Sequence, residues 1–416
     1  MTDPTEPAAG APRSGRASSS RRQFLFGGAI AGVGAAVAIG ASQLVQSGPP
    51  AASESESPAA PLNGAKTYPF YGAHQAGVET AAPAHGALVA LDLHADVDRA
   101  RLRGLLRMLT DDAARLTQGA PALADTEPEL AATPAGLTVT FGFGPELVRR
   151  AGAAAPDWLR PLPAFTVDRL EDAYSGGDLL LQIGADEPLT VAHTVRMLLK
   201  DTRSFAEIRW IQHGFRRAHG SASEGTAMRN LFGQVDETVN PSPGSEDFAA
   251  VVWSQDGWMN GGTSMVVRRI HMNLDTWDEL DRPGREQAVG RTLDTGAPLT
   301  GKKEHDEPDF TAVTPVGFPV IPEFSHLRRA RSDDRSQRIF RRSFTYDDPP
   351  SAGGISNAGL IFVSFQADVD AQFVPIQRRI DELDLLNKWI TPIGSAVFAI
   401  PPGCAPGGFI GEGMFA

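Results

Sequence analysis

Residues Gly86-Ala87-Leu88-Val89-Ala90-Leu91-Asp92-Leu93 form the apolar stretch with which the folded part of the chain begins. Its alternating, largely aliphatic pattern predicts a β-strand. After it, leucine and alanine residues recur at intervals of three and four, which predicts an amphipathic helix over residues 97–117. The fold therefore begins with a strand and a helix that has one apolar face.

The rest of the first half continues in the same way. We expect further strands at residues 137–143, 178–183 and 208–214, and a second helix at residues 188–200. The resulting order, β-α-β-β-α-β, is the split-βαβ or ferredoxin-like pattern. It forms an antiparallel sheet with helices on one face.

The second half repeats this order more loosely. Its strand-like stretches are residues 248–254, 264–274, 338–346, 360–365 and 395–400, and its helical stretches are residues 275–290 and 369–386. Residues 291–335 are charged, rich in proline and poorly periodic, which predicts a long irregular segment. We therefore expect an α+β protein with two ferredoxin-like domains, residues 71–243 and 244–416, each an antiparallel sheet packed with helices.

Composition excludes several classes of protein. Of the 416 residues, 42% are hydrophobic and 21% are charged, which suits a chain with a core. The formal net charge of −12 argues against a nucleic-acid partner, because no basic excess is present to neutralise phosphates. The single cysteine, Cys404, excludes an internal disulfide, a zinc-finger cluster and a thiolate-bound iron–sulfur site. Without a Cys-x-x-Cys-His run, covalent c-type haem is excluded as well.

The N-terminus predicts an export signal. Arg21 and Arg22 precede an apolar run rich in alanine and glycine, from Phe26 to Ala41, as in twin-arginine signal peptides. A membrane anchor is the alternative, but the run is shorter and less apolar than a span requires. We expect a signal peptide at residues 1–52, a low-complexity linker at residues 53–70, and the twin-arginine translocase as a partner during export. The destination is the periplasm, the cell wall or the medium.

Three kinds of residue could carry chemistry. His326 lies on the irregular segment, where a lone histidine is more often solvated than a metal ligand, and Asp236 lies in a stretch that could be only a polar turn. Arg341 and Arg342 are adjacent on an expected strand, so they face opposite ways. One should point inward, unless both are solvated on an edge strand. Together, a histidine, an aspartate and an arginine are what a haem peroxidase needs as iron ligand, acid–base group and charge stabiliser.

From about Gly72 to Ala416, the chain resembles the dye-decolourising peroxidases of the exported type, including the deferrochelatases associated with iron uptake. The stretches that carry this resemblance are Phe141–Gly144, Asn230–Asp236, Val267–Ile270, Gly296–Gly301, Ser325–Arg328, Ile339–Arg342 and Leu360–Gln366. The resemblance implies two ferredoxin-like domains, with one non-covalent haem b per chain held in the C-terminal domain.

Site residues follow from the resemblance position by position. His326 matches the proximal iron ligand, Asp236 the distal aspartate and Arg341 the distal arginine. Asp384 matches the carboxylate that hydrogen-bonds the proximal imidazole. Arg328, through a haem propionate, and Ser343 are further implied contacts of the haem.

A peroxidase reaction follows from the same resemblance, with hydrogen peroxide as oxidant and dyes, phenols or other small or bulky aromatic molecules as electron donors. Bulky donors would be oxidised at the protein surface, with Tyr346, Trp389 and Trp258 as candidate relays, although core packing explains each of them better. The alternative is an exported haem-handling protein that carries haem or releases its iron. The oligomeric state, a homo-oligomer included, is left open.

One residue departs from the family pattern. Where the family has Gly-x-x-Asp-Gly, this chain has Gly233-Gln234-Val235-Asp236-Glu237. Glycine in such a loop serves a left-handed backbone conformation or a close approach, neither of which glutamate adopts cheaply. Because a pocket sized for peroxide has little room for a second long side chain, we expect Glu237 to point to solvent and to have little influence on Asp236.

Overall fold

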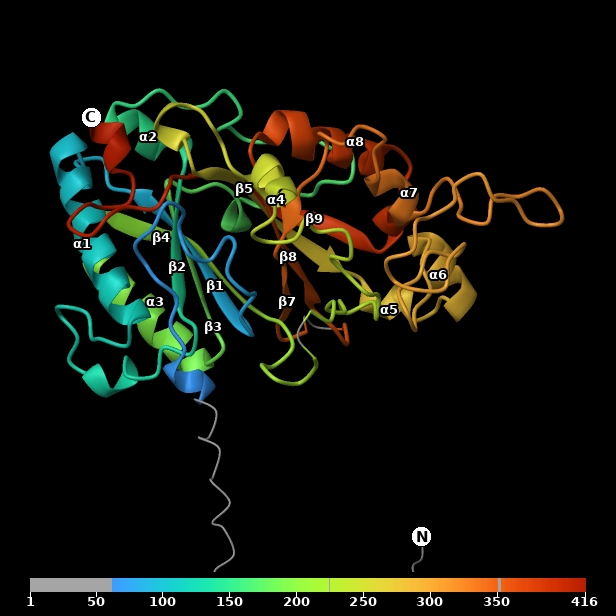
Figure 1. Ribbon diagram of the computed structural model, residues 1–416, viewed down its shortest axis with the longest axis horizontal. Coiled ribbons are helices and arrows are strands. Elements are labelled where there is room, and N and C mark those ends of the chain that lie inside the picture. Colours follow the sequence, from blue (N-terminus) through green and yellow to red (C-terminus); the bar gives the residue numbers. More distant parts are fainter. Residues whose placement is uncertain (1–61, 224, 351–352) are drawn as a thin grey trace, which may run out of the picture. The chain divides into compact units, whose positions relative to one another are not determined.

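The computed structural model describes residues 62–223, 225–350 and 353–416, which Figure 1 shows in colour. The predicted signal peptide and the first half of the predicted linker, residues 53–61, lie outside these residues. The described end of that linker contains a short 3₁₀ turn, Asn63–Ala65, and leads to Phe70, which is buried in the core. From residue 62 onward, the described chain belongs to one compact unit.

The first half forms the predicted β-α-β-β-α-β unit, with strand order β4-β1-β3-β2 and antiparallel neighbours throughout. The carboxylate of Asp98 caps the first helix by accepting the N–H of Arg101. Its leucines then lie buried on one face, as their spacing predicts. The elements are β1 (His85–Leu93), α1 (Arg99–Thr117), β2 (Thr138–Phe143), α2 (Pro145–Ala151), β3 (Leu179–Ala185), α3 (Pro188–Thr202) and β4 (Ala206–Phe215).

The second half has the same strand order, β9-β5-β8-β7, with the short β6 also paired to β8. This repeat confirms an α+β fold built from two ferredoxin-like units. The elements are α4 (Glu246–Val252), β5 (Thr263–Met272), α5 (Leu274–Trp277), α6 (Arg282–Val289), α7 (His326–Ala330), β6 (Phe340–Arg341), β7 (Phe344–Asp347), β8 (Ala358–Gln366), α8 (Val374–Leu383) and β9 (Ile390–Ile400).

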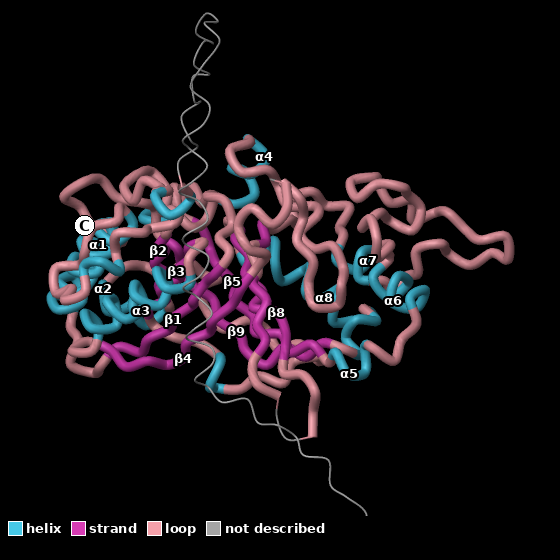
Figure 2. Tube along the Cα trace, turned by 90° about the horizontal axis from the view of Figure 1, so that it is seen from below, coloured by secondary structure: helices cyan, strands magenta, loops and turns pink. Residues whose placement is uncertain are grey.

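The two units join edge to edge. Phe143 of β2 pairs with Ala399 of β9, and Phe215 of β4 pairs with Thr345 of β7. Since β5 pairs with both β9 and β8, the described strands form a closed circuit, β5-β9-β2-β3-β1-β4-β7-β8 and back to β5. Figures 1 and 2 show these strands between α1 and α3 on one side and α6 to α8 on the other.

Both faces of the circuit are buried. Along β1, Ala87 and Val89 belong to the apolar cluster that includes α1 and α3, whereas Leu88 and Ala90 belong to a second cluster inside the circuit. That inner cluster also contains large side chains from the second half, Phe344, Phe365 and Phe398 among them. A continuous apolar run, rather than a strict alternation with polar residues, is what such a strand requires.

Three expectations for the second half are wrong in detail. Residues 248–254, expected as a strand, lie mostly in α4, which Ser245 caps through its side chain and in which Phe248, Val251 and Val252 are buried at helical spacing. Residues 275–290 form two short helices, α5 and α6. The expected strand 338–346 is interrupted between β6 and β7, at Arg342 and Ser343.

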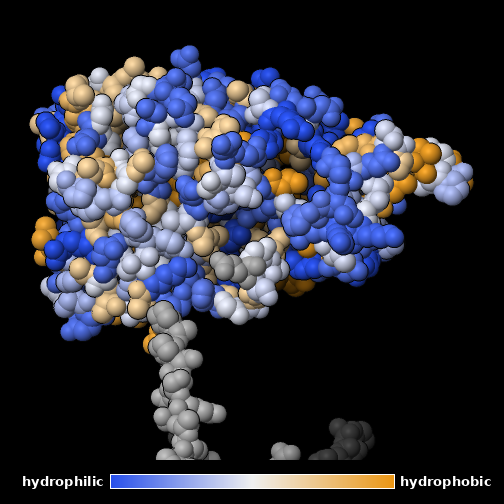
Figure 3. All heavy atoms as spheres, in the orientation of Figure 1, coloured by the Kyte–Doolittle hydropathy of each residue, from blue (hydrophilic) through white to orange (hydrophobic). Residues whose placement is uncertain are grey.

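Other expectations hold. Residues 369–386 are helical, as a π-helical turn followed by α8 and a 3₁₀ turn. The segment from residue 291 to α7 is irregular, and one part of it projects from the molecule (Figure 1) with Val313, Val316 and Phe318 exposed. Figure 3 shows apolar atoms along this projection. No helix among the described residues is long and apolar enough to span a membrane.

A buried pair of carboxyl groups makes the stability of the first half depend on pH. Burial and the neighbouring Asp112 of α1 raise the pKa of Asp201, on α3, to about 7. In the unfolded chain, Asp201 ionises near 3.8. The contribution of this pair to stability is therefore largest at low pH and falls as pH rises from about 4 to 7, since folding then requires Asp201 to be ionised beside Asp112 or to take up a proton.

We predict that Asp201→Asn makes the protein more stable at pH 8, by about 1–2 kcal/mol after allowance for solvent screening. At pH 4 the change should be small, because Asp201 is then protonated. Denaturant unfolding at the two pH values measures the difference. Asp111→Asn, an exposed position on α1, is the control, and an equal effect of Asp201→Asn at both pH values would contradict the prediction.

Candidate active site

His326 is held by a buried carboxylate. It is the first residue of α7, and its Nδ1 lies 2.5 Å from Oδ2 of Asp384. Asp384 follows the last residue of α8, has no exposed side-chain surface, and accepts the N–H of Leu386 with its other oxygen. The end of one helix thus fixes the side chain at the start of another, and the predicted pairing of these two residues is present.

Because Asp384 accepts a hydrogen bond from the N–H at Nδ1, the lone pair of the neutral ring lies on Nε2. Burial by itself lowers the pKa of His326, but the charge of Asp384 and its hydrogen bond outweigh burial and raise the pKa. Within the described residues, Nε2 has no hydrogen-bond partner, and 31% of the side chain is exposed. His326 can therefore offer this nitrogen to a metal.

The donor set fits a haem better than a bare metal ion. No group of three or more His, Cys, Asp or Glu side chains among the described residues could hold a metal. An iron bound by His326 must therefore bring most of its own ligands, as the iron of a porphyrin does. The carboxylate behind the imidazole is the usual partner that orients such a ligand.

Asp236 and Arg341 form the second pair of the site. Nη2 of Arg341 lies 2.5 Å from Oδ1 of Asp236, with 22% and 11% of the two side chains exposed. Burial raises the pKa of Asp236, but the charge of Arg341 and the hydrogen bond from the N–H of Glu237 together lower it by more. The net pKa of Asp236 therefore lies below its ordinary value of 3.8. The charges of both residues also act on the pKa of His326. The two pairs, His326 with Asp384 and Asp236 with Arg341, are therefore close enough for their charges to interact.

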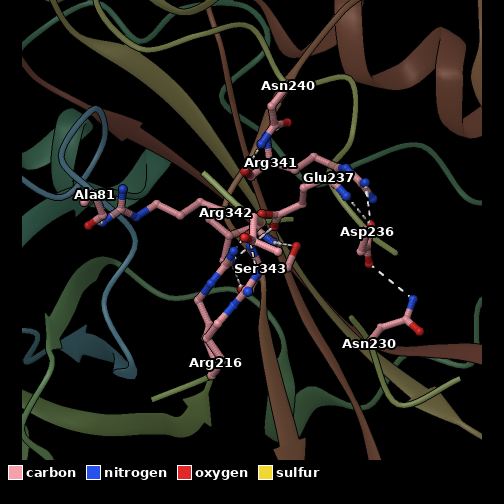
Figure 4. Close-up of polar contacts among 12 residues, drawn as sticks. Ala81, Arg216, Asn230, Asp236, Glu237, Asn240, Arg341, Arg342 and Ser343 are labelled. Carbon is pink, nitrogen blue, oxygen red and sulfur yellow. Dashed lines mark hydrogen bonds and ion pairs between the residues drawn. The ribbon is translucent and has the colours of Figure 1, made fainter. Parts of the chain in front are cut away.

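Two asparagine side chains hold Arg341 by its backbone and Asp236 by its carboxylate (Figure 4). The side chain of Asn240 donates to the carbonyl of Arg341 over 2.7 Å and accepts its N–H over 2.9 Å. The side chain of Asn230 donates to Oδ2 of Asp236 over 3.3 Å. Neither asparagine is among the residues predicted from the sequence. They flank Asp236 in a stretch that could be only a polar turn, so composition alone does not single them out.

Glu237 does not point to solvent, and our expectation for it is wrong. Its backbone has a φ of +63°, the left-handed conformation that glycine adopts readily. Its carboxylate is 10% exposed and forms an ion pair with Arg216, directly after β4, over 2.9 Å. It also accepts the N–H of Ser343 over 2.8 Å. The side chain of Glu237 thus joins its own loop to two other segments, at Arg216 and at Ser343.

Arg342 is buried too, which excludes the alternative of two solvated arginines. Its guanidinium donates to the carbonyls of Thr80 and Ala81, at 2.9 Å from the latter, and only 3% of the residue is exposed. Burial, and then the charge of Arg216, lower its pKa to about 10. Arg341 and Arg342 lie where β6 ends, and they diverge as expected (Figure 4).

The other two predicted haem contacts are engaged by the protein. Arg328 donates to the carbonyls of Phe310 and Ile321, at 3.2 and 3.4 Å, and its guanidinium lies over the ring of Phe310. Ser343 is buried, and its backbone contacts Glu237 and Arg216. Their contacts with haem remain predictions.

Two family models match this chain. "Dyp-type peroxidase, N-terminal" matches residues 75–216, and "Dyp-type peroxidase, C-terminal" matches residues 227–405. A dye-decolorizing peroxidase from Thermobifida fusca (strain YX) is 36% identical over 425 residues, which cover 97% of this chain and 99% of the relative. The chain belongs to the DyP-type peroxidase family.

Solved structures agree with this membership. A DyP-type peroxidase from Cellulomonas bogoriensis is 53% identical, with a TM-score of 0.83 over 85% of this chain and 99% of that one. Ferric DtpA from Streptomyces lividans is 40% identical, with a TM-score of 0.82 over 86% and 100%. A deferrochelatase from Escherichia coli (strain K12) is 35% identical over 80% of this chain and 84% of the relative. This DyP-type peroxidase is thus an enzyme, a dye-decolourising haem peroxidase with the predicted fold.

Substitution of the two adjacent arginines should affect different properties of this DyP-type peroxidase: Arg341 the rate with peroxide, and Arg342 the stability of the fold. Arg341→Ala removes the cation beside Asp236, so we predict that the rate of the Soret change on mixing with peroxide falls about 100- to 1000-fold. Arg342→Ala leaves buried carbonyls unpaired, which should cost about 1–3 kcal/mol of stability but keep that rate within about tenfold. Stopped-flow absorbance and denaturant unfolding measure the two effects. A larger loss of rate in Arg342→Ala would reverse the assignment.

Proposed function

We propose that this DyP-type peroxidase reduces hydrogen peroxide at one non-covalent haem b per chain, with His326 as the only protein ligand to iron. Asp236 is the acid–base group and Arg341 the charge stabiliser. The observation that carries the proposal is two ion pairs, His326–Asp384 and Asp236–Arg341, each formed by residues distant in sequence, with the charges of the second pair acting on His326.

Haem, when bound, supplies the redox equivalents for cleavage of the O–O bond. Asp236, which is ionised over most of the pH range, takes a proton from peroxide on one oxygen and delivers it to the other, which leaves as water. Arg341 stabilises the negative charge that develops on the leaving oxygen. Asp384 holds His326 in the tautomer that offers Nε2 and strengthens it as an electron donor.

Aromatic contacts support oxidation of bulky donors at the surface. Trp389 is partly exposed and meets the buried Trp277 edge-on, with ring centroids 5.2 Å apart. Trp277 in turn stacks on Phe232 at 4.3 Å, in the loop that carries Asp236. Among the three candidate relays, this arrangement favours Trp389. Tyr346 is only 1% exposed, so a donor cannot reach it directly.

Release of iron from haem is a second candidate function, and the 35% identity to a deferrochelatase favours it. The two functions give different responses to added peroxide. A peroxidase shows a rapid Soret change that is reversed by an aromatic donor, with haem retained. A haem-handling protein shows slow bleaching or free iron, which a ferrous chelator detects.

Export by the twin-arginine pathway belongs to the same proposal. It is supported by Arg21 and Arg22 before the apolar run, which lie outside the described residues. The pathway carries proteins that are already folded, which agrees with a cofactor enzyme. Secretion of a reporter fused to residues 1–52, compared with the same fusion carrying Arg21→Lys and Arg22→Lys, tests this part.

Loss of the iron ligand should release the cofactor. We predict that His326→Ala loses most of its haem, or keeps it with the spectrum of a different ligand, because no other described histidine is presented with a buried carboxylate in this site. The Soret absorbance per protein measures haem content. His305→Ala, an exposed histidine in the same irregular segment, is the control, and full haem retention with an unchanged spectrum in His326→Ala would refute the assignment.

The pH dependence of the peroxide reaction should follow Asp236. Because its pKa lies below 3.8, the rate should hold as pH falls from 7 to 4, and decline only when Asp236 becomes protonated. In Arg341→Ala, the charge that offsets the effect of burial on Asp236 is lost, so the pKa of Asp236 should rise and the decline in rate should begin at a higher pH. Stopped-flow rates between pH 3 and 7 test this shift. Arg338→Ala, which removes an exposed ion pair with Asp247, is the control, and in this variant the rate should decline at the same pH as in the unchanged protein.

A further inference from the structure

Three segments meet at the carboxylate of Glu237. Arg216 comes from the end of β4, Glu237 follows Asp236 in its loop, and Ser343 lies in the link between β6 and β7. The two ends of the Arg216 guanidinium lie 2.9 and 3.3 Å from the carboxylate oxygens of Glu237. The backbone of Ser343 joins both side chains: its N–H donates to Glu237 over 2.8 Å and its carbonyl accepts from Arg216 over 2.6 Å. Figure 4 shows this cluster, which we name the Glu237 clamp.

Glutamate is a costly residue at this position. A left-handed backbone costs a non-glycine residue about 1–2 kcal/mol. Burying its carboxylate and the Arg216 guanidinium, 10% and 12% exposed, adds the cost of removing two charges from water. Both carboxylate oxygens have partners here, which offsets that cost. A glycine would relieve the strain, but it would leave Arg216 buried beside Arg342 without a carboxylate.

The clamp is connected to the proposed catalytic pair at both ends. The N–H of Glu237 donates over 2.8 Å to Oδ1 of Asp236, the same oxygen that accepts from Arg341. Ser343 is two residues beyond Arg341, and the side chain of Asn240 forms two hydrogen bonds with the backbone of Arg341. The loop that carries Asp236 therefore holds the strand that carries Arg341 at two points, Asn240 on one side and Glu237 on the other.

We propose that Glu237, through its ion pair with Arg216, is a positioning residue that holds Asp236 and Arg341 at hydrogen-bond distance for the reaction with peroxide. This inference rests on the proposed roles of Asp236 and Arg341. It assigns a function to the position where the chain departs from the glycine of its family, and it makes Arg216, at the end of the first half, part of a site otherwise built from the central loop and the second half.

The test compares Glu237→Gln, Glu237→Gly and the double variant Glu237→Gln/Arg216→Gln in the haem-loaded enzyme. We expect Glu237→Gln and Glu237→Gly each to slow the Soret change with peroxide about 10- to 100-fold, as loss of an outer partner typically does. The rate of donor oxidation at saturating peroxide should change little. The double variant, whose two amides can bond to each other without an unpaired charge, should recover part of the lost rate.

A second readout does not depend on turnover. The affinity of the ferric enzyme for fluoride reports hydrogen-bond donors that face a ligand on the iron, and it should fall in parallel with the peroxide rate. Glu146→Gln is the matched control, because Glu146 pairs with Arg149 and Arg150 on α2, apart from the clamp. It should lower stability without altering fluoride affinity or the rate with peroxide.

Two results would overturn the proposal in distinguishable ways. If the Glu237 variants lose stability but keep the peroxide rate and the fluoride affinity within twofold, while Asp236→Asn and Arg341→Ala lose them, Glu237 is only a structural residue. If Asp236→Asn and Arg341→Ala also keep the rate, the proposed function itself fails. Should Glu237→Gly not fold, Glu237→Gln, which keeps the length of the side chain, carries the comparison.

Discussion

The antiparallel pair between Phe215 and Thr345 is the contact on which the site depends. It joins the last residue of β4 to β7, and with the pair between Phe143 and Ala399 it turns two four-stranded sheets into one circuit. In antiparallel register, the residue after Phe215 lies beside the residues before Thr345. Backbone pairing thus places Arg216 next to Ser343, within reach of Glu237.

Charge pairing organises the site around that framework. Each acid beside the proposed iron site has a cationic or proton-donating partner at 2.5 Å: Asp384 has His326, and Asp236 has Arg341. In both pairs, burial opposes ionisation and the partner outweighs it, so that the pKa of His326 is raised and that of Asp236 is lowered. The result is a histidine whose Nε2 can bind a metal and an aspartate that is ionised, each held by a charged or hydrogen-bonded partner.

Much of the fold could be predicted from the sequence, because elements such as β1 and α1 carry their periodicity within a single segment. The same holds for β8 and β9. Residues 248–254 are ambiguous because their apolar residues suit a strand as well as a helix, and only the capping Ser245 distinguishes the two. The break at Arg342 and Ser343 is not visible locally, since it results from partners in residues 80–81 and 216–237.

The site could be predicted only in part. His326, Asp236 and Arg341 are individually weak candidates, and their proposed roles follow from a resemblance over residues 72–416. The structure pairs Asp236 with Arg341 and His326 with Asp384. Asn240 and Arg216 act through backbone groups of residues about a hundred positions away, for which a sequence offers no local signal. We expected Glu237 to point to solvent because a pocket for peroxide has little room for a second long side chain. Its carboxylate is nevertheless buried, because it pairs with the buried guanidinium of Arg216.

The closed circuit of strands also has a consequence for how the protein is made. During synthesis, β2 must wait for β9, the last strand of the chain's described part, before its outer edge is paired. The first half can form its own helices and sheet early, but that sheet keeps open edges until β7 and β9 have been synthesised. Such long-range pairing makes folding slow, and exposed strand edges invite aggregation meanwhile. Shielding the edges of β2 and β4 during this interval would therefore favour correct pairing over aggregation.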